Sequence, residues 1–150
     1  KNLLTSISTG IYRLIPFKLV VFSVLRRIVR VPDAIRHRLW FFGPFTVDAG
    51  NGARFTMVNH GHPLETMIFW SGLFGGWEHR TMALWAKACV GARCVLDVGA
   101  NTGVFALSAK AITSTARVHC FEPIPRVRQR LVENVALNGM DILVHGIAIS

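Results

Sequence analysis

The sequence has few acidic residues, few cysteines and no apolar run that could cross a bilayer at its N-terminal end. Eight Asp and Glu stand against 17 Lys and Arg. The three cysteines, Cys89, Cys94 and Cys120, show no metal-ligand spacing, so we predict buried reduced thiols, a reducing compartment and no metal site. The apolar run from Leu19 to Leu25 is too short for a transmembrane helix, and no signal-peptide cleavage site follows it.

The excess of basic residues is unevenly distributed. Residues 1–45 hold eight Lys and Arg against one Asp, a net charge of +7, whereas residues 46–150 hold nine against seven acids, a net charge of +2. A nucleic-acid-binding domain would carry its charge on the domain itself, so the distribution argues against a nucleic-acid partner. Apolar residues make up 51% of the chain, which predicts a folded protein rather than a disordered one.

The basic N-terminal segment contains a predicted amphipathic helix. Its apolar residues recur with helical spacing, at Phe17, Val20, Val21, Val24, Leu25 and Ile28. Lys18, Arg26, Arg27 and Arg30 flank this stripe. One interpretation is that residues 17–30 lie on an anionic membrane surface. The other is that the helix packs on the rest of the protein and leaves its arginines in solvent.

The next stretch predicts a hairpin followed by helical segments. Thr46–Ala49 and Ala53–Val58 flank the turn residues Gly50–Gly52, which is typical of two paired strands. Met67–Phe74 is apolar and ends at a pair of glycines, and His79–Val90 has the composition of a helix. We expect these elements to be accessory to the domain that follows.

Residues 94–112 predict the ligand-binding corner of an open α/β sheet. Cys94–Val98 is a short apolar run with Asp97 near its end, which indicates a buried parallel strand. A turn with two glycines follows, and Val104–Ile112 predicts a helix. Strand, turn and helix start together form such a corner. We expect Asn101 or Thr102 to cap the helix.

The details of this corner favour S-adenosylmethionine over a dinucleotide. A dinucleotide site requires G-x-G-x-x-G, but only Gly99 and Gly103 are present, so the glycine that admits the pyrophosphate is missing. A carboxylate at Asp97 would repel a phosphate and attract the ammonium group of the methionine end. A nucleotide-dependent oxidoreductase stays open as an alternative, although both of these details count against it.

The second predicted strand ends in an acid at the sequence spacing that is expected from the glycine turn. Arg117–Glu122 predicts this strand, and Glu122 lies 19 residues beyond Gly103, close to the spacing of about 20 at which an acid reaches ribose hydroxyls. Ile142–Ile147 predicts a third strand, and Ala148 would lie near the edge of an adenine.

Three motifs in this region resemble one family. They are D-V-G-A-N-x-G at Asp97–Gly103, F-E-P at Phe121–Pro123 and L-x-x-N-x-x-L-N at Leu131–Asn138. The sequence is similar to the FkbM-like branch of the class I S-adenosylmethionine-dependent methyltransferases. The resemblance is strong over residues 91–150 and weaker over residues 64–90, where Gly76-Trp77-Glu78 looks like the aromatic-Glu pair that precedes the family's first strand.

The resemblance implies a function and a set of binding residues. It implies O-methylation of a hydroxyl on a sugar or other small metabolite. It also implies that Asp97, Gly99, Asn101 and Gly103 bind the methyl donor and that Glu122 holds the ribose. Glu78 could contact the methionine ammonium or cap the helix that follows, and both readings stay open. No residue is assigned as a catalytic base.

The expected architecture is a Rossmann-like α/β sheet of about three parallel strands, preceded by a helical segment and a hairpin. Residues 1–45 form the basic helical segment, 46–90 the accessory hairpin and helix, and 91–150 the N-terminal half of the donor-binding domain. We expect a truncated domain that is inactive alone and cytoplasmic, with peripheral membrane contact open. A membrane-associated or interaction module with a vestigial half-domain is the alternative from a different functional class.

Overall fold

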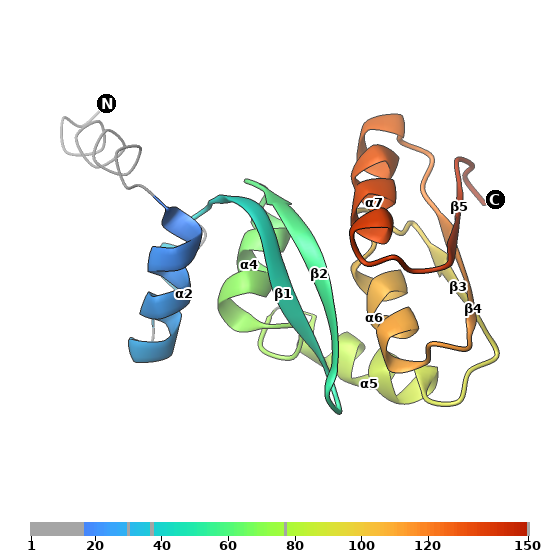
Figure 1. The fold of residues 1–150 in the computed structure, drawn as a ribbon, viewed down its shortest axis with the longest axis horizontal. Helices are drawn as coiled ribbons and strands as arrows, with labels where there is room; N and C mark the ends of the chain where they lie inside the picture. The colour runs from blue at the N-terminus through green and yellow to red at the C-terminus, as the bar shows by residue number, and fades with distance from the viewer. Residues whose placement is uncertain (1–16, 30, 37, 77, 150) are drawn as a thin grey trace.

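The computed structural model describes residues 17–149, apart from residues 30, 37 and 77. Its helices and strands follow in the order shown in Figure 1: α2 (Lys18–Ile28), α3 (Asp33–Arg36), β1 (Phe42–Gly50), β2 (Ala53–His60), α4 (Pro63–Ser71), α5 (His79–Cys89), β3 (Cys94–Val98), α6 (Val104–Ile112), β4 (Arg117–Phe121), α7 (Pro125–Leu137) and β5 (Ile142–His145).

The C-terminal half forms the expected parallel sheet, with strand order β3-β4-β5. Asp97 pairs in register with Cys120, and Cys120 with Val144. Helices α6 and α7 cover one face of this sheet (Figure 1). The predicted Rossmann-like α/β fold with three parallel strands, a preceding helix and a hairpin is therefore confirmed.

The hairpin is longer than predicted and packs against the helices that cover the parallel sheet. Strands β1 and β2 pair antiparallel from Phe42 opposite His60 to Gly50 opposite Ala53. Asn51 turns the chain with a φ of 53°, a left-handed conformation that Asn tolerates better than most residues. Strand β2 contacts both α6 and α7, so these two helices lie between the hairpin and the parallel sheet (Figure 1).

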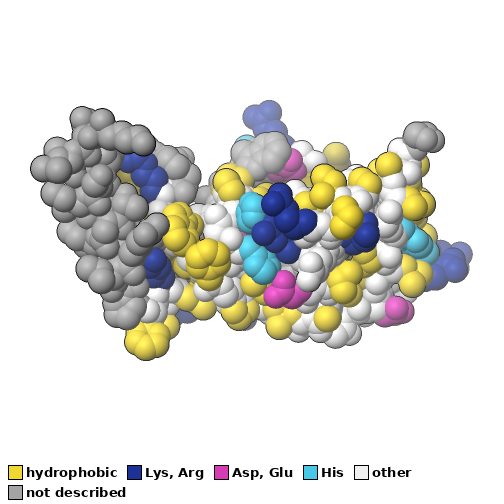
Figure 2. Space-filling model, turned by 90° about the horizontal axis from the view of Figure 1, so that it is seen from above, with side chains coloured by type: hydrophobic (Ala, Val, Ile, Leu, Met, Phe, Trp, Pro, Cys, Tyr) yellow, Lys and Arg dark blue, Asp and Glu magenta, His cyan; other side chains and the backbone are white. Residues whose placement is uncertain are grey.

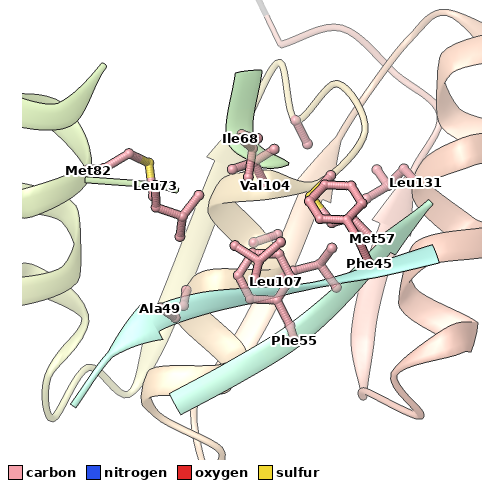
Figure 3. Packing of buried hydrophobic residues seen from close by; sticks show 14 of the residues in the cluster. Phe45, Ala49, Phe55, Met57, Ile68, Leu73, Met82, Val104, Leu107 and Leu131 are labelled. Carbon is pink, nitrogen blue, oxygen red and sulfur yellow. The ribbon is translucent and has the colours of Figure 1, made fainter. Parts of the chain in front are cut away.

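A single hydrophobic core joins these layers. Phe55 and Met57 of β2 point toward Leu107 of α6 and Leu131 of α7 (Figure 3), and all four side chains are at most 2% exposed. Burying one side chain of this size stabilises the fold by roughly 1.5–3 kcal/mol. The hairpin and the half of the chain that contains the parallel sheet are thus coupled through shared packing.

Helix α2 packs through a face that differs from the predicted one. Phe22 is its buried residue, and its ring lies 6.5 Å from that of Phe41 and 5.4 Å from that of Trp70. Most of the predicted apolar stripe is exposed to solvent, including Phe17 at 82% and Ile28 at 74%. The helix therefore packs on the rest of the protein, as one of the two interpretations expects, but mainly through the face opposite this stripe, where Phe22 meets Phe41 and Trp70.

One of the predicted flanking arginines also faces the protein. Arg26 donates a hydrogen bond to the Phe69 carbonyl oxygen at 2.7 Å, and its guanidinium lies 4.5 Å from the centre of the Phe69 ring. Residues 1–16 of the predicted N-terminal segment and Arg30 lie outside the described residues. Within the part of the chain that the structure describes, no helix has the length and apolarity needed to span a bilayer.

Candidate functional site

The turn between β3 and α6 is built from left-handed backbone conformations. Gly99 has a φ of 78°, Asn101 of 49° and Gly103 of 96°. The amides of Gly99 and Ala100 both donate to the Phe121 carbonyl oxygen, at 2.9 and 3.1 Å. This bonding holds the turn against the end of the neighbouring strand β4. The sequence therefore places its glycines where the backbone requires them.

Gly103 has a second reason to be glycine. A Cβ atom at this position would lie 2.5 Å from Leu131 Cδ1, which is closer than two carbon atoms can approach. Leu131 is fully buried on α7 and cannot move aside freely. Gly103 therefore serves the packing of α6 against α7 and does not line the candidate cavity described below.

The Asp97 side chain stabilises the first turn of α6 by a hydrogen bond. Its side chain is 8% exposed, and Oδ2 accepts a hydrogen bond from the Ala106 amide at 3.0 Å. The expected cap by Asn101 or Thr102 is wrong: the capping position is Gly103, with no side-chain cap bond, and the strand carboxylate takes over this role. Burial raises the pKa of Asp97 to about 6, although the Ala106 hydrogen bond opposes the shift.

Glu122 joins the turns that follow β3 and β4. Its Oε2 accepts from the Asn101 amide at 3.0 Å, and its Oε1 accepts from the Ile124 amide at 2.9 Å. The residue is 5% exposed. Each carboxylate oxygen has two lone pairs, so one acceptor position per oxygen is left for a ligand hydroxyl. In this structure Glu122 first of all fixes the conformation of the Asn101 turn.

A cavity of about 270 Å³ brings part of the predicted site together. Glu78, Gly99 and Asn101 line it, at the carboxyl end of β3. Glu78 occupies the capping position of α5 but makes no side-chain cap bond, which leaves its carboxylate available to the cavity. Ala148 is exposed and does not line this cavity, and Trp77 lies outside the described residues.

The remaining wall of this cavity comes from residues that the sequence analysis did not select. Leu64, Met67 and Ile68 of α4 contribute, together with Leu73 in the following loop. Figure 3 shows Ile68 beside Val104, at the start of α6. The apolar run before the two glycines was the available signal, but its spacing did not reveal which structure it would face.

The asparagines of the third motif bind the hairpin. Asn134 is fully buried; its Oδ1 accepts from the Val58 amide at 2.9 Å, and its Nδ2 donates to the Thr102 carbonyl at 2.9 Å. One turn later, Asn138 accepts from the Thr56 amide and donates to the Thr56 carbonyl, both at 2.7 Å. The motif thus links the edge of β2 to the turn that lines the cavity.

His60 and His62 each contact a charged side chain on α7. His60 Nε2 lies 3.0 Å from Glu133 Oε2, and His62 contacts Arg130, so the two histidines have separate partners on α7. Figure 2 shows histidine, basic and acidic side chains gathered on this face.

All three cysteines are free thiols, but Cys94 is exposed, so the prediction that all are buried is wrong for that residue.

Comparisons with known proteins place the chain only in part. No family model matches it. A stretch of 56 residues, 37% of the chain, is 43% identical to the AMB antimetabolite synthetase AmbE of Pseudomonas aeruginosa strain PAO1. This stretch is 3% of the length of that synthetase, so the chain spans a small part of the curated relative that it matches.

Two solved structures share an arrangement of elements with the chain. One is an S-adenosylmethionine-dependent methyltransferase of Agrobacterium tumefaciens, with 17% identity, a TM-score of 0.49, and coverage of 72% of this chain and 33% of that one. The other is TYW2 of Pyrococcus horikoshii in complex with MeSAdo, with 24% identity, a TM-score of 0.39, and coverage of 47% and 27%. At these values the likeness is limited to the fold.

Proposed function

We propose that this chain supplies the donor-binding half of an S-adenosylmethionine-dependent methyltransferase. The observation that carries the proposal is the cavity at the carboxyl end of β3, where Glu78, Gly99 and Asn101 converge. Ligands of open α/β sheets bind outside the carboxyl ends of the strands, and a mostly apolar pocket with a few convergent polar groups is the usual form of such a site.

The residues around the cavity fit the chemistry of this donor. Glu78 lines the cavity, and the carboxylate of Asp97 accepts from the first turn of the adjoining helix α6, so an ammonium group would meet negative charge. A Cβ at Gly99 would meet no atom within 4 Å, which leaves open space beside the backbone of the turn. Gly103 and Glu122 would act less directly, by holding the turn in shape.

The proposed reaction is O-methylation of a hydroxyl on a sugar or other small metabolite. The donor, when bound, supplies a methyl group made electrophilic by its sulfonium. The chain's own contribution is to position the donor and to exclude water with the apolar wall of Leu64, Met67 and Ile68. No described residue is assigned as a catalytic base.

The alternative of a nucleotide-dependent oxidoreductase has less support. A pyrophosphate at this turn would lie near the carboxylates of Asp97 and Glu78, and the position of the admitting glycine is occupied by Asn101. These negative charges would oppose phosphate binding. The corner therefore favours a ligand with a positively charged end.

Calorimetric titration with S-adenosylmethionine and with NAD tests the proposal. We expect binding of the former only, and at least tenfold weaker binding after Glu78→Gln, about 1.4 kcal/mol. Glu133→Gln is the matched control, because the Glu133 side chain is 49% exposed and does not line the cavity. Tighter binding of NAD, or equal effects of both variants, would contradict the assignment.

A second candidate function is peripheral contact of residues 17–30 with a membrane surface. The exposed apolar side chains of α2, including Phe17 and Ile28, favour it. This role is compatible with a cytoplasmic methyltransferase that acts at a membrane surface.

A further inference from the structure

A second cavity, of about 540 Å³, lies between α2 and the hairpin. Its polar side chains come from α2 and from both strands of the hairpin: Ser23, Arg26, Arg27, Thr46, Asp48 and Arg54. Three guanidinium groups and one carboxylate give these side chains a net charge of +2. The cavity is separate from the candidate donor site and shares no lining residue with it.

The described residues compensate little of the positive charge of this cavity. Burial lowers the pKa of Arg26, and the neighbouring charge of Arg27 lowers it further. The second and smaller cause is repulsion between the two guanidinium groups. Asp48 uses its Oδ1 to accept from the Gly50 amide at 2.8 Å. Among the described residues, no carboxylate lies within 4.0 Å of the arginine nitrogens of this cavity. An anion would therefore relieve the repulsion.

An exposed apolar surface adjoins the cavity. At 100° per residue, Arg27 lies on α2 between the cavity residue Ser23 and the exposed residue Val20. Val20 is 61% exposed and Val24 is 50% exposed, and both belong to the stripe that also contains Phe17 and Ile28.

This combination fits an amphiphile with an anionic head. Guanidinium groups hold phosphate through several charge-assisted hydrogen bonds, and each arginine has five N–H donors. A soluble phosphate compound would use the arginines but would leave the apolar stripe in water. A membrane lipid would use both, because its acyl boundary can cover the stripe while its head enters the cavity.

We propose that the cavity between α2 and the hairpin binds the phosphate of an anionic membrane lipid, with the apolar stripe of α2 in the headgroup boundary. The proposal rests on the membrane contact of residues 17–30 and is independent of the methyltransferase assignment. It adds a defined headgroup site to what would otherwise be general attraction of a basic helix to negative charge.

Co-sedimentation of the chain with vesicles of phosphatidylcholine, alone or mixed with phosphatidic acid, tests the site. Removing a basic residue from a general electrostatic surface lowers binding about fivefold, at about 1 kcal/mol per residue. Removing a charge-assisted hydrogen bond costs roughly 1.5–3 kcal/mol, or about 10- to 150-fold. We therefore expect a loss above tenfold for Arg54→Ala and for Arg27→Ala on the mixed vesicles.

Matched variants separate the contributions of charge and apolar surface. Arg80→Ala makes the same charge change on the exposed face of α5 and should lower binding fivefold at most. Val24→Ser should weaken binding to the mixed vesicles, whereas Leu84→Ser, at a residue that is 70% exposed on α5, should not. Arg26 is left intact because its contact with Phe69 supports the fold.

A third arm distinguishes the membrane from a soluble source of phosphate. Glycerol 3-phosphate is titrated against the chain, followed by the amide resonances of Thr46 and Arg54. We expect weak binding of glycerol 3-phosphate and strong binding to the mixed vesicles. Binding of glycerol 3-phosphate without vesicle binding would overturn the lipid assignment, and equal losses in Arg54→Ala and Arg80→Ala would overturn the headgroup site.

Discussion

The two faces of the parallel sheet differ sharply in what covers them. On the face toward α6 and α7, Val118 and Cys120 are at most 1% exposed. On the opposite face, Leu96 is 59% exposed, Val98 58% and Leu143 50%. Parallel sheets are ordinarily buried on both faces, and apolar residues occupy both faces here. The strands therefore have the composition of a sheet with two covered faces, while the described chain covers one.

The functional motifs belong to the covered side of the sheet. Asp97 and Glu122 accept backbone hydrogen bonds that hold α6 and the Asn101 turn, and Asn134 ties that turn to the hairpin. Residues that would contact a donor are thus supported by a layer of buried, hydrogen-bonded polar side chains. Substitutions on the covered face should damage the fold and the site together, and substitutions on the open face should affect neither.

The largest effect is expected at Gly103 on the covered face. Gly103→Ala forces a side chain into a left-handed conformation, which costs about 1–2 kcal/mol, and against Leu131, where overpacking costs about 1–3 kcal/mol. The free energy of unfolding in urea should fall by about 2–5 kcal/mol. Gly91→Ala is the control, since Gly91 has a φ of 74° but a Cβ there meets nothing within 4 Å.

Gly91→Ala should therefore lose the conformational part alone. Equal losses in the two variants would mean that Leu131 moves aside without cost and that the helix contact is looser than the structure has it.

A smaller loss is expected when the buried asparagine is removed. Asn134→Ala leaves the Val58 amide and the Thr102 carbonyl without partners inside the protein. An unsatisfied buried group costs about 1–3 kcal/mol. The Val58 amide is only part-buried and costs less than this, so we expect a total loss of about 2–4 kcal/mol in the free energy of unfolding. Asn138→Ala should cost less, because Asn138 is half-buried and water can replace its bonds to Thr56. The reverse order would contradict the bridging role of Asn134.

The pH dependence of donor binding reports on Asp97. Its pKa is raised to about 6 in the folded protein, so between the unfolded value and pH 6 the folded state holds its proton more tightly. Stability from this group is therefore present at low pH and is lost as the pH rises toward 6. Donor affinity should change in the opposite direction, because an ammonium group favours the ionised carboxylate.

From pH 5 to pH 7 the affinity for S-adenosylmethionine should rise about tenfold, or about 1.4 kcal/mol, and then level off. Calorimetry at several pH values measures this rise, and Asp97→Asn should flatten it. A flat profile in the unaltered chain would mean that Asp97 serves α6 alone.

The elements of this fold were predictable where short-range physics determines them. The strand Cys94–Val98 and the helix Val104–Ile112 match the prediction because strand and helix residues differ in period and in flanking glycines. The face of α2 that packs was not predictable, since it depends on Phe41 and Trp70, which lie far away in the sequence. A helical stripe indicates that one face of a helix is apolar, but it does not identify the residues that the helix contacts.

Part of the candidate site was likewise predictable from the sequence, and part of it was not. Glu78, Gly99 and Asn101 were predicted from spacing and resemblance, and they share a cavity. The α4 wall was not predicted, because its position follows from the packing of the hairpin on α6 and α7. The bonds that Glu122 makes to two backbone amides were also beyond the sequence, since they depend on how two turns meet in space.

The smallest effect on stability is expected on the open face. Leu143→Lys replaces a half-exposed side chain, and surface substitutions of this kind change the free energy of unfolding by less than about 0.5 kcal/mol. Its effect on association should be larger, because Leu96, Val98 and Leu143 form an apolar surface and β3 pairs with β4 alone among the described strands. An unpaired strand edge and an apolar face both promote contact between copies.

We therefore expect the chain to elute from gel filtration as oligomers and Leu143→Lys to shift it toward the monomer. Val132→Lys is the control, at a residue that is 49% exposed on α7, away from this face. A monodisperse unaltered chain would show that this apolar face does not drive association. An equal shift in both variants would mean that added charge, rather than the loss of the apolar face, keeps the copies apart.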